Sequence, residues 1–395
     1  MTAVEREPEV KERVELTAEA AGGREQGPPV ARLIGGSPVR LWGMTAAERL
    51  RRLLARAGVA DVAAWDGTAA AGRPHLLIRG DHVFAAALIP DLLARPGAVL
   101  LHEERPVAAH VDAGAAGRVA EAMDAGRLPD ASGLELLEPH ALGSPHDPAL
   151  RKRSVPYVLR LTPASLDEAE RRTFDGSYKG VTDFVTRHVW PAPARRVTRW
   201  CAEAGVTPNM VTMASLGLVL LAFWLFWIGA FLPGLVAAWA MTFLDTVDGK
   251  LARVTVTSSR LGNAFDHGID LIHPPFWYWA WAAGVWSAGG APAGLDMALA
   301  VTVAGYVVQR LQEGLFLGLF KMEIHVWRRF DSLFRLVVAR RNPNLALLTL
   351  FALFGAPGAG LIAVAVWTGV SLVVHTAQIV QAARAPAPLR SWLAA

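Results

Sequence analysis

Residues 243–275 read FLDTVDGKLARVTVTSSRLGNAFDHGIDLIHPP, and four aspartates interrupt two long apolar segments here. Asp245 and Asp248 are three positions apart and share one helix face. Asp266 and Asp270 are four apart and share a face of the next helix. Carboxylates inside membrane segments are costly and mark functional sites. Two antiparallel helices would bring both pairs together, so we expect a divalent cation site. All-oxygen ligands favour Mg²⁺, Mn²⁺ or Ca²⁺ over zinc.

Six apolar segments begin at residue 209, and a membrane-spanning helix needs about 20 residues. The expected spans are 209–230, 232–252, 261–287, 292–319, 343–356 and 358–382, of which the fifth is the shortest. The loops after the first, third and fifth spans contain no Lys or Arg, whereas the 320–342 loop is strongly basic. The positive-inside rule therefore places both termini, this loop and the aspartates on the cytoplasmic side.

Small and cationic residues accompany the aspartates. Gly249 directly follows Asp248, and Gly262 opens the second helix face. Glycine lets a ligand or another helix approach the backbone closely. Arg253, one turn beyond Gly249, carries a permanent positive charge that suits a phosphate oxygen. Metal ions beside arginine and glycine suit a pyrophosphate substrate, because they neutralise the phosphates and stabilise a leaving nucleotide.

The string from Asp245 to Asp270 reads D-x2-D-G-x2-A-R-x8-G-x3-D-x3-D, with eight specified positions within 26 residues. It resembles the signature of the CDP-alcohol phosphotransferase (CDP-alcohol phosphatidyltransferase) family, with no fixed position missing. TPNMVT at 207–212 is similar to the family's usual entry into the membrane, and the resemblance extends over roughly 177–384. It implies a polytopic domain of six transmembrane helices, with the motif across the second and third.

The resemblance also implies a reaction, in which a hydroxyl group attacks the β-phosphorus of a CDP-linked alcohol, CMP leaves and a phosphodiester forms. Such a transfer needs positioning, charge neutralisation and one proton acceptor. The implied ligands of Mg²⁺ or Mn²⁺, with two ions expected, are Asp245, Asp248, Asp266 and Asp270. The implied catalytic residues are Asp270, as general base, and Asp266. The implied CDP-binding residues are Gly249, Ala252, Arg253 and Gly262.

The setting that fits this chemistry is phospholipid biosynthesis at the cytoplasmic (inner) membrane. Two substrate pairs fit equally: CDP-diacylglycerol with a small polyol, or a CDP-linked head group with a lipid acceptor. Membrane lipids and, from the family, a second copy in a homodimer are the expected partners, and nothing indicates nucleic acid. An alternative is a structural ion-pair network or a membrane cation relay built from the same aspartates, which predicts no CMP release.

The N-terminal part differs in composition, because Arg, Glu and Asp are frequent there. The segment 44–59 has helical periodicity, the apolar runs 75–78 and 98–101 suit buried strands, and 83–95 suits a helix between them. This rhythm predicts a soluble α/β domain with a parallel sheet. It resembles a nucleotidyltransferase domain, as in bifunctional inositol-phosphate cytidylyltransferases fused to a CDP-alcohol phosphotransferase. By that resemblance Asp81, which ends a strand, would bind metal.

The glycine-rich nucleotide loop of that fold is missing, and GGSP at 35–38 is a poor substitute because no clear strand precedes it. A triphosphate needs backbone N–H groups and cations around it. We therefore expect a degenerate domain that serves docking, dimer formation or regulation. A bifunctional enzyme that also makes its CDP-alcohol from CTP is the alternative.

The expected organisation has five parts: a disordered tail (1–28), the α/β domain (29–150), a connector with an interfacial amphipathic helix (151–200), the membrane domain (201–384) and a C-terminal tail (385–395). Val181, Phe184, Val185, His188 and Val189 form the apolar stripe of that helix. A linker helix packed on the soluble domain is the alternative. The N-terminus lacks the apolar core of a secretory signal, and Cys201 is the single cysteine, which excludes an intrachain disulfide.

Three further features leave alternatives open. The basic 320–342 loop either only sets the topology or also binds an anionic head group or acceptor. Arg310 and Glu313 either line the same cavity or form a salt bridge with each other. His267, inside the motif, is more often a packed, hydrogen-bonded histidine than a metal ligand in such a context.

Overall fold

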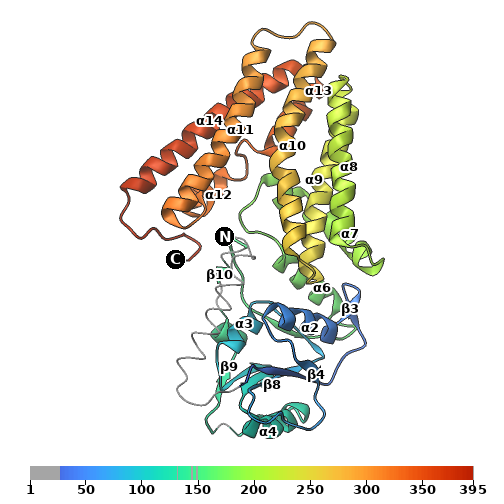
Figure 1. Ribbon diagram of the computed structural model, residues 1–395, viewed down its shortest axis with the longest axis vertical. Coiled ribbons are helices and arrows are strands. Elements are labelled where there is room, and N and C mark those ends of the chain that lie inside the picture. The colour runs from blue at the N-terminus through green and yellow to red at the C-terminus, as the bar shows by residue number, and fades with distance from the viewer. Residues whose placement is uncertain (1–26, 131, 144–145, 148–149, 395) are drawn as a thin grey trace. The chain divides into compact units, whose positions relative to one another are not determined.

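The computed structural model describes residues 27–130, 132–143, 146–147 and 150–394 (Figure 1). They form two compact units. The first comprises the chain up to residue 178 with 202–204 and 253–257, and the second comprises 179–201, 205–252 and the chain from 258 onward. The expected tail, 1–28, lies outside the described residues apart from its last two.

The first unit is built on a six-stranded mixed sheet with the strand order β4-β1-β5-β8-β7-β9. Its strands are β1 (Val30–Ile34), β4 (Val62–Ala64), β5 (His75–Arg79), β7 (Ala98–His102), β8 (Arg105–Val111) and β9 (Glu135–Leu137). All neighbouring pairs are parallel except those that β8 makes with β5 and β7. The expected strands at 75–78 and 98–101 therefore run parallel, but β8 lies between them.

Helices cover both faces of this sheet because its strands are apolar on both sides. Leu76 and Ile78 belong to one core with helices α2 (Ala46–Arg56) and α3 (Leu88–Leu93), whereas Leu77 faces the other core with α4 (Ala113–Asp124). Thr45 caps α2 in a capping box with Glu48. The α/β architecture expected for this part is present.

Two local expectations for this unit are wrong. A strand, β1, does precede the glycines of GGSP, although its central Arg32 interrupts the apolar run. The segment 83–95 is not one helix, because β6 (His82–Phe84) pairs with β12 (Val158–Arg160) before α3 begins. The remaining short elements are β2 (Arg40–Leu41), β3 (Met44–Thr45), α5 (Pro139–Leu142), β10 (His146–Asp147), β11 (Lys152–Arg153) and α6 (Leu166–Gly176).

The second unit is helical, and a helix occupies each of the six expected spans (Figure 1). These helices are α8 (Pro208–Trp227), α9 (Phe231–Val254), α10 (Arg260–Ser287), α11 (Leu295–Phe320), α13 (Arg341–Leu353) and α14 (Pro357–Arg384). The 3₁₀ turn η2 (Ile324–Val326) and α12 (Arg329–Phe334) lie between α11 and α13.

Glycines allow the long helices to pack closely. A Cβ at Gly284 of α10 would lie 2.1 Å from the backbone oxygen of Phe226 in α8, and one at Gly305 of α11 would lie 2.4 Å from Cγ2 of Thr368 in α14. Trp277 adds a bond between helices, since its indole N–H donates to the Val219 oxygen of α8 at 3.0 Å. Small residues at helix crossings are typical of membrane bundles.

Among the described helices, α8 and α14 are long and apolar enough to cross a membrane by length and composition. Only 33% of the apolar window of α8 and 39% of that of α14 is buried, unlike the core helix of a soluble protein. The other four contain charged residues or, for α13, only 13 residues. The prediction of six spans therefore remains a prediction.

The segment 177–200 is not one continuous helix. A π-helical turn, η1 (Val185–Val189), precedes α7 (Pro191–Glu203), and Val181 lies before both, packed with Val326 and Leu393. Phe184 and Val189 remain about half exposed, at 52% and 49%. The five residues of the stripe therefore do not form a single helix face. Within the helical part, the apolar side chains of Phe184 and Val189 are still exposed.

Candidate active site

The aspartates come from two helices that follow each other in the chain. Asp245 and Asp248 lie on the C-terminal half of α9, and Asp266 and Asp270 lie on the N-terminal half of α10. Carboxylate oxygens of Asp245, Asp248 and Asp266 all lie within 4.8 Å of one another, close enough to hold one metal ion. Ser259 starts α10 as its N-cap, accepting a hydrogen bond from the Gly262 N–H at 3.0 Å.

Asp248 is the most deeply buried of the four, at 3% exposure. Its Oδ2 accepts a hydrogen bond of 2.7 Å from the Thr212 hydroxyl of α8. Its Oδ1 is buried and has no hydrogen-bond partner within the described part of the chain. A buried carboxylate oxygen without a partner is costly, and a cation would satisfy it. The carboxylate set therefore fits an oxygen-ligated divalent ion.

Arg341, the first residue of α13, reaches the same cluster from a distant part of the sequence. Its guanidinium donates to Asp270 through Nη1 and to Asp245 through Nη2. Asp270 is thus bridged to Asp245 through an arginine. In the sequence, Arg341 is marked only as part of the strongly basic 320–342 loop. Its place at the start of an apolar span is the feature of the sequence that could have indicated a contact with the motif aspartates.

A second network holds the start of α13 in place. Asp183 is buried, and its Oδ1 accepts hydrogen bonds from the Asn342 side chain at 2.9 Å and the Thr186 N–H at 3.0 Å. Burial raises the pKa of Asp183, but Arg335 and these hydrogen bonds outweigh it and hold the pKa below its ordinary value. The carboxylate therefore stays charged and fixes Asn342, the neighbour of Arg341.

The expected CDP-binding residues occupy the ends of the two motif helices. Gly249 and Ala252 follow Asp248 on α9, and Arg253 lies on its last turn, in the segment 253–257 of the first unit. Gly262 lies on the first turn of α10, where a Cβ would come within 2.9 Å of Ser259 Oγ and 3.1 Å of Asn209 Oδ1. A larger residue at 262 would therefore crowd the side chains of Ser259 and Asn209.

The structure gives the contacts of the residues in two of the open alternatives. Arg310 and Glu313 form a salt bridge of 2.9 Å. His267 is exposed, and its Nδ1 hydrogen bonds to the Asn263 oxygen at 2.9 Å, so it is hydrogen-bonded but not packed.

In the first unit, Asp81 does follow a strand, but its carboxylate is fully paired. Arg79 donates to both oxygens, at 3.0 and 2.9 Å, and the His82 ring bonds to Oδ1 at 2.8 Å. Burial raises the pKa of Asp81, yet the bonds from His82 and Arg79 outweigh it and hold the pKa well below its usual range. Gly80 contacts the loop after β1, since a Cβ there would lie 2.5 Å from the Gly35 oxygen.

Comparison with known proteins links this arrangement to one family. Residues 205–370 match the family described as CDP-alcohol phosphatidyltransferase. The chain is 30% identical over 141 residues to cholinephosphotransferase 1 of Gallus gallus, covering 31% of this chain and 39% of that protein. It is 36% identical over 81 residues to archaetidylinositol phosphate synthase of Pyrococcus horikoshii, covering 20% and 43%.

A third relative is the bifunctional IPC transferase and DIPP synthase of Rubrobacter xylanophilus. It is 28% identical over 202 residues, which cover 51% of this chain and 44% of that protein. The matches thus span less than half the length of each of these curated relatives.

Proposed function

Because residues 205–370 match the CDP-alcohol phosphatidyltransferase family, we propose that this chain transfers a substituted phosphate from a CDP-linked alcohol to a hydroxyl acceptor and releases CMP. The observation that carries the proposal is the group of three carboxylates, from Asp245, Asp248 and Asp266, with Asp270 joined to it through Arg341. The names of the relatives, a cholinephosphotransferase and an archaetidylinositol phosphate synthase, support a role in phospholipid synthesis.

We assign divalent metal binding, as two Mg²⁺ or Mn²⁺ ions, to the four motif aspartates. The buried, unpartnered Oδ1 of Asp248 and the all-oxygen donor set support this assignment. When bound, the ions would neutralise the diphosphate and stabilise the departing CMP. These ligands come from two adjacent helices, so the positions of the carboxylates are set by the packing of α9 and α10.

Residues of the chain would provide the general base of the transfer and the binding site for CDP. Asp270 accepts the proton of the acceptor hydroxyl as its oxygen bonds to the β-phosphorus, and the bond from that phosphorus to the CMP oxygen breaks. Arg341 bonds to Oδ1 of Asp270, so we assign the proton to Oδ2. Gly262 keeps the backbone open to the nucleotide, and Gly249, Ala252 and Arg253 complete the CDP-binding set by the family motif.

The helices at the six expected spans would then cross a membrane, with the active site and the N-terminal unit on the cytoplasmic side. The Lys- and Arg-rich 320–342 segment and the uncharged opposite loops support this orientation. The acceptor is a lipid or a small polyol, and assays with each kind of acceptor distinguish the two. The homodimer inferred from the family is a proposal that light scattering in detergent would test.

We further propose that the N-terminal unit does not activate CTP. Both carboxylate oxygens of Asp81 already accept hydrogen bonds from Arg79 or His82, which compensate its charge without a metal. The Rubrobacter relative is named as a bifunctional enzyme, and a second activity of this chain, the activation of CTP, is therefore the alternative. Release of pyrophosphate from CTP and a phosphorylated polyol by the full chain would overturn this proposal.

The transferase is tested with purified full-length protein in detergent, Mg²⁺ or Mn²⁺, and paired donors and acceptors. The expected result is a new phosphodiester, identified by mass spectrometry, that forms with equimolar CMP and only with metal present. A cation relay would instead give metal binding without CMP from any donor–acceptor pair, and that result would refute the transferase.

A further inference from the structure

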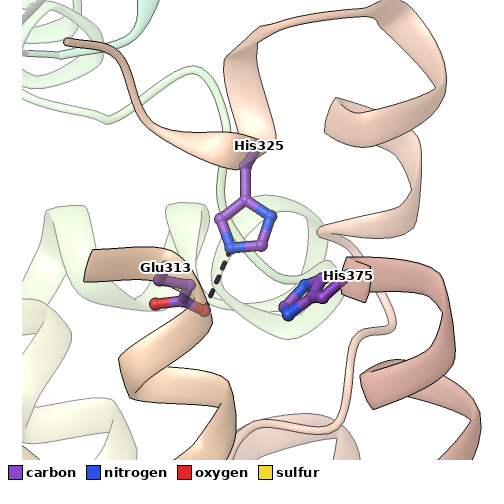
Figure 2. Close-up of side chains that lie close together, drawn as sticks. All are labelled: Glu313, His325 and His375. Atoms are coloured by element: carbon purple, nitrogen blue, oxygen red, sulfur yellow. Dashed lines mark hydrogen bonds and ion pairs between the residues drawn. The ribbon is translucent and has the colours of Figure 1, made fainter. Parts of the chain in front are cut away.

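A second group of side chains that could hold a metal ion lies apart from the motif aspartates, on three other elements. Glu313 comes from α11, His325 from η2 and His375 from α14, and Figure 2 shows the three side chains converging. Their ligand atoms all lie within 4.8 Å of one another. Glutamate and two histidines provide one oxygen and two nitrogens, unlike the all-carboxylate set of the motif.

The two histidines are buried without the partners that such burial requires. His375 is 0% exposed, and neither of its ring nitrogens has a hydrogen-bond partner among the described residues. His325 is 2% exposed, and its Nδ1 is also without a partner there. The two rings are tilted relative to each other, with a centroid distance of 5.4 Å and an angle of 56° between their planes. Buried imidazole nitrogens without partners are rare, and a group bound between them would satisfy them.

Glu313 is already oriented toward the histidines. Its Oε2 accepts a bond from Arg340, and its Oε1 faces Nε2 of His325 at 3.3 Å, a long distance for a hydrogen bond (Figure 2). Arg310 also donates to Oε1, at 2.9 Å. The arginine on Oε2 thus acts as a partner that fixes the carboxylate, as neighbours of metal ligands commonly do.

We propose that Glu313, His325 and His375 bind a Zn²⁺ ion. Zinc prefers imidazole nitrogen and carboxylate oxygen, and three protein ligands leave a fourth position for water or an anion. Mg²⁺ and Ca²⁺ take oxygen ligands, so the two sites of this chain select different metals.

The neighbouring arginines favour a negatively charged fourth ligand on the zinc ion. Arg310 and Arg340 both pair with Glu313, so a bare dication would raise the positive charge of the cluster. An anionic fourth ligand, such as hydroxide or chloride, offsets that charge. The ion links α11, the turn at 324–326 and α14, so it would hold the segment after α11 against both long helices.

The test measures zinc in the full-length protein, purified in detergent and equilibrated with Zn²⁺ under a large excess of Mg²⁺ to occupy the motif aspartates. Elemental analysis should find about one zinc per wild-type chain and a loss of most of it in His375→Gln and His325→Gln. The matched control His188→Gln changes an exposed histidine of the same unit, and Asp248→Asn changes the motif; both should retain the zinc.

A second readout does not depend on any variant folding. Co²⁺ in place of zinc gives strong visible absorption when four-coordinate and weak absorption when bound by six oxygens. Wild-type protein should show the strong absorption, and chelation should remove it and speed amide hydrogen exchange at 322–328. Folded wild type that retains no zinc and shows only the weak absorption would overturn the proposal, as would equal zinc in wild type and His375→Gln.

Discussion

Replacing Arg341 by methionine should lower the stability of the metal-free protein and, at the same time, increase the affinity of the active site for metal. The guanidinium of Arg341 joins Asp245 and Asp270, and the side chains of Arg341 and Asp245 are 17% and 16% exposed. Removing one partner of a nearly buried ion pair leaves carboxylates uncompensated and costs on the order of 3 kcal/mol. We therefore expect Arg341→Met, in the absence of divalent metal, to unfold at a lower temperature than wild type.

Metal binding should respond in the opposite direction. Arg341 and a metal ion compete for Asp245, so a bound ion must displace or share the guanidinium. A hydrogen bond to a charged group contributes about 1.5–3 kcal/mol. If the ion no longer has to overcome that bond, the dissociation constant for Mg²⁺ falls about 10- to 100-fold. Saturating Mg²⁺ should also restore most of the lost stability, because ligand binding stabilises the folded state.

The assay is thermal unfolding in detergent with EDTA or Mg²⁺, together with calorimetric Mg²⁺ titration. Arg384→Met, which changes an exposed arginine at the end of α14, is the matched control and should leave both quantities near wild type. A folded Arg341→Met protein whose Mg²⁺ affinity is equal to or weaker than that of wild type would refute the competition.

Other predictions follow from single contacts. Gly284→Ala should lower the melting temperature, by the equivalent of about 1–3 kcal/mol, because its Cβ would lie 2.1 Å from the Phe226 oxygen. Gly217→Ala, on the exposed side of α8 with no atom within 4 Å, should be neutral or stabilising, and equal losses in both variants would contradict this. The depressed pKa of Asp81 stabilises the fold above the unfolded-state pKa of about 3.9, and this contribution is lost as pH falls below it toward the folded-state pKa. Pulse proteolysis of the N-terminal unit should show that loss below about pH 4 in wild type, whereas Asp81→Asn should be less stable at pH 7 and show a smaller acid loss.

The sequence predicted the parts of the site that depend on local spacing. Asp245 and Asp248 share a face of α9 because three residues make nearly one helical turn, and Asp266 was placed beside them by expecting antiparallel helices. The contact of Arg341 could not be predicted in this way. It lies 71 positions from Asp270, and only the packing of α13 against α9 and α10 brings them together.

The misjudged segments show where tertiary contacts override local patterns. Val181 fits a helical stripe in the sequence, but residues 181–183 are not helical. Asp183 bonds to Asn342 and the Phe184 N–H donates to the Leu336 oxygen, and these contacts hold the chain at the start of η1. The sequence pattern does not predict strand β1, because Arg32 breaks its apolar run. This arginine pairs with Asp61 at 2.8 Å, next to the edge strand of the sheet. Pairings between residues so far apart leave no periodic signal in the sequence.

The central claim is that the motif aspartates carry out phosphate transfer, and Asp270→Asn tests it most directly. The measurement is CMP release by the full-length protein from its best donor and acceptor with Mg²⁺, compared with the exposed control Asp296→Asn. The account predicts that Asp270→Asn lowers the rate about 10²- to 10⁴-fold, the usual contribution of a general base, and that the control retains it. Wild-type rates in a folded Asp270→Asn protein would contradict the account.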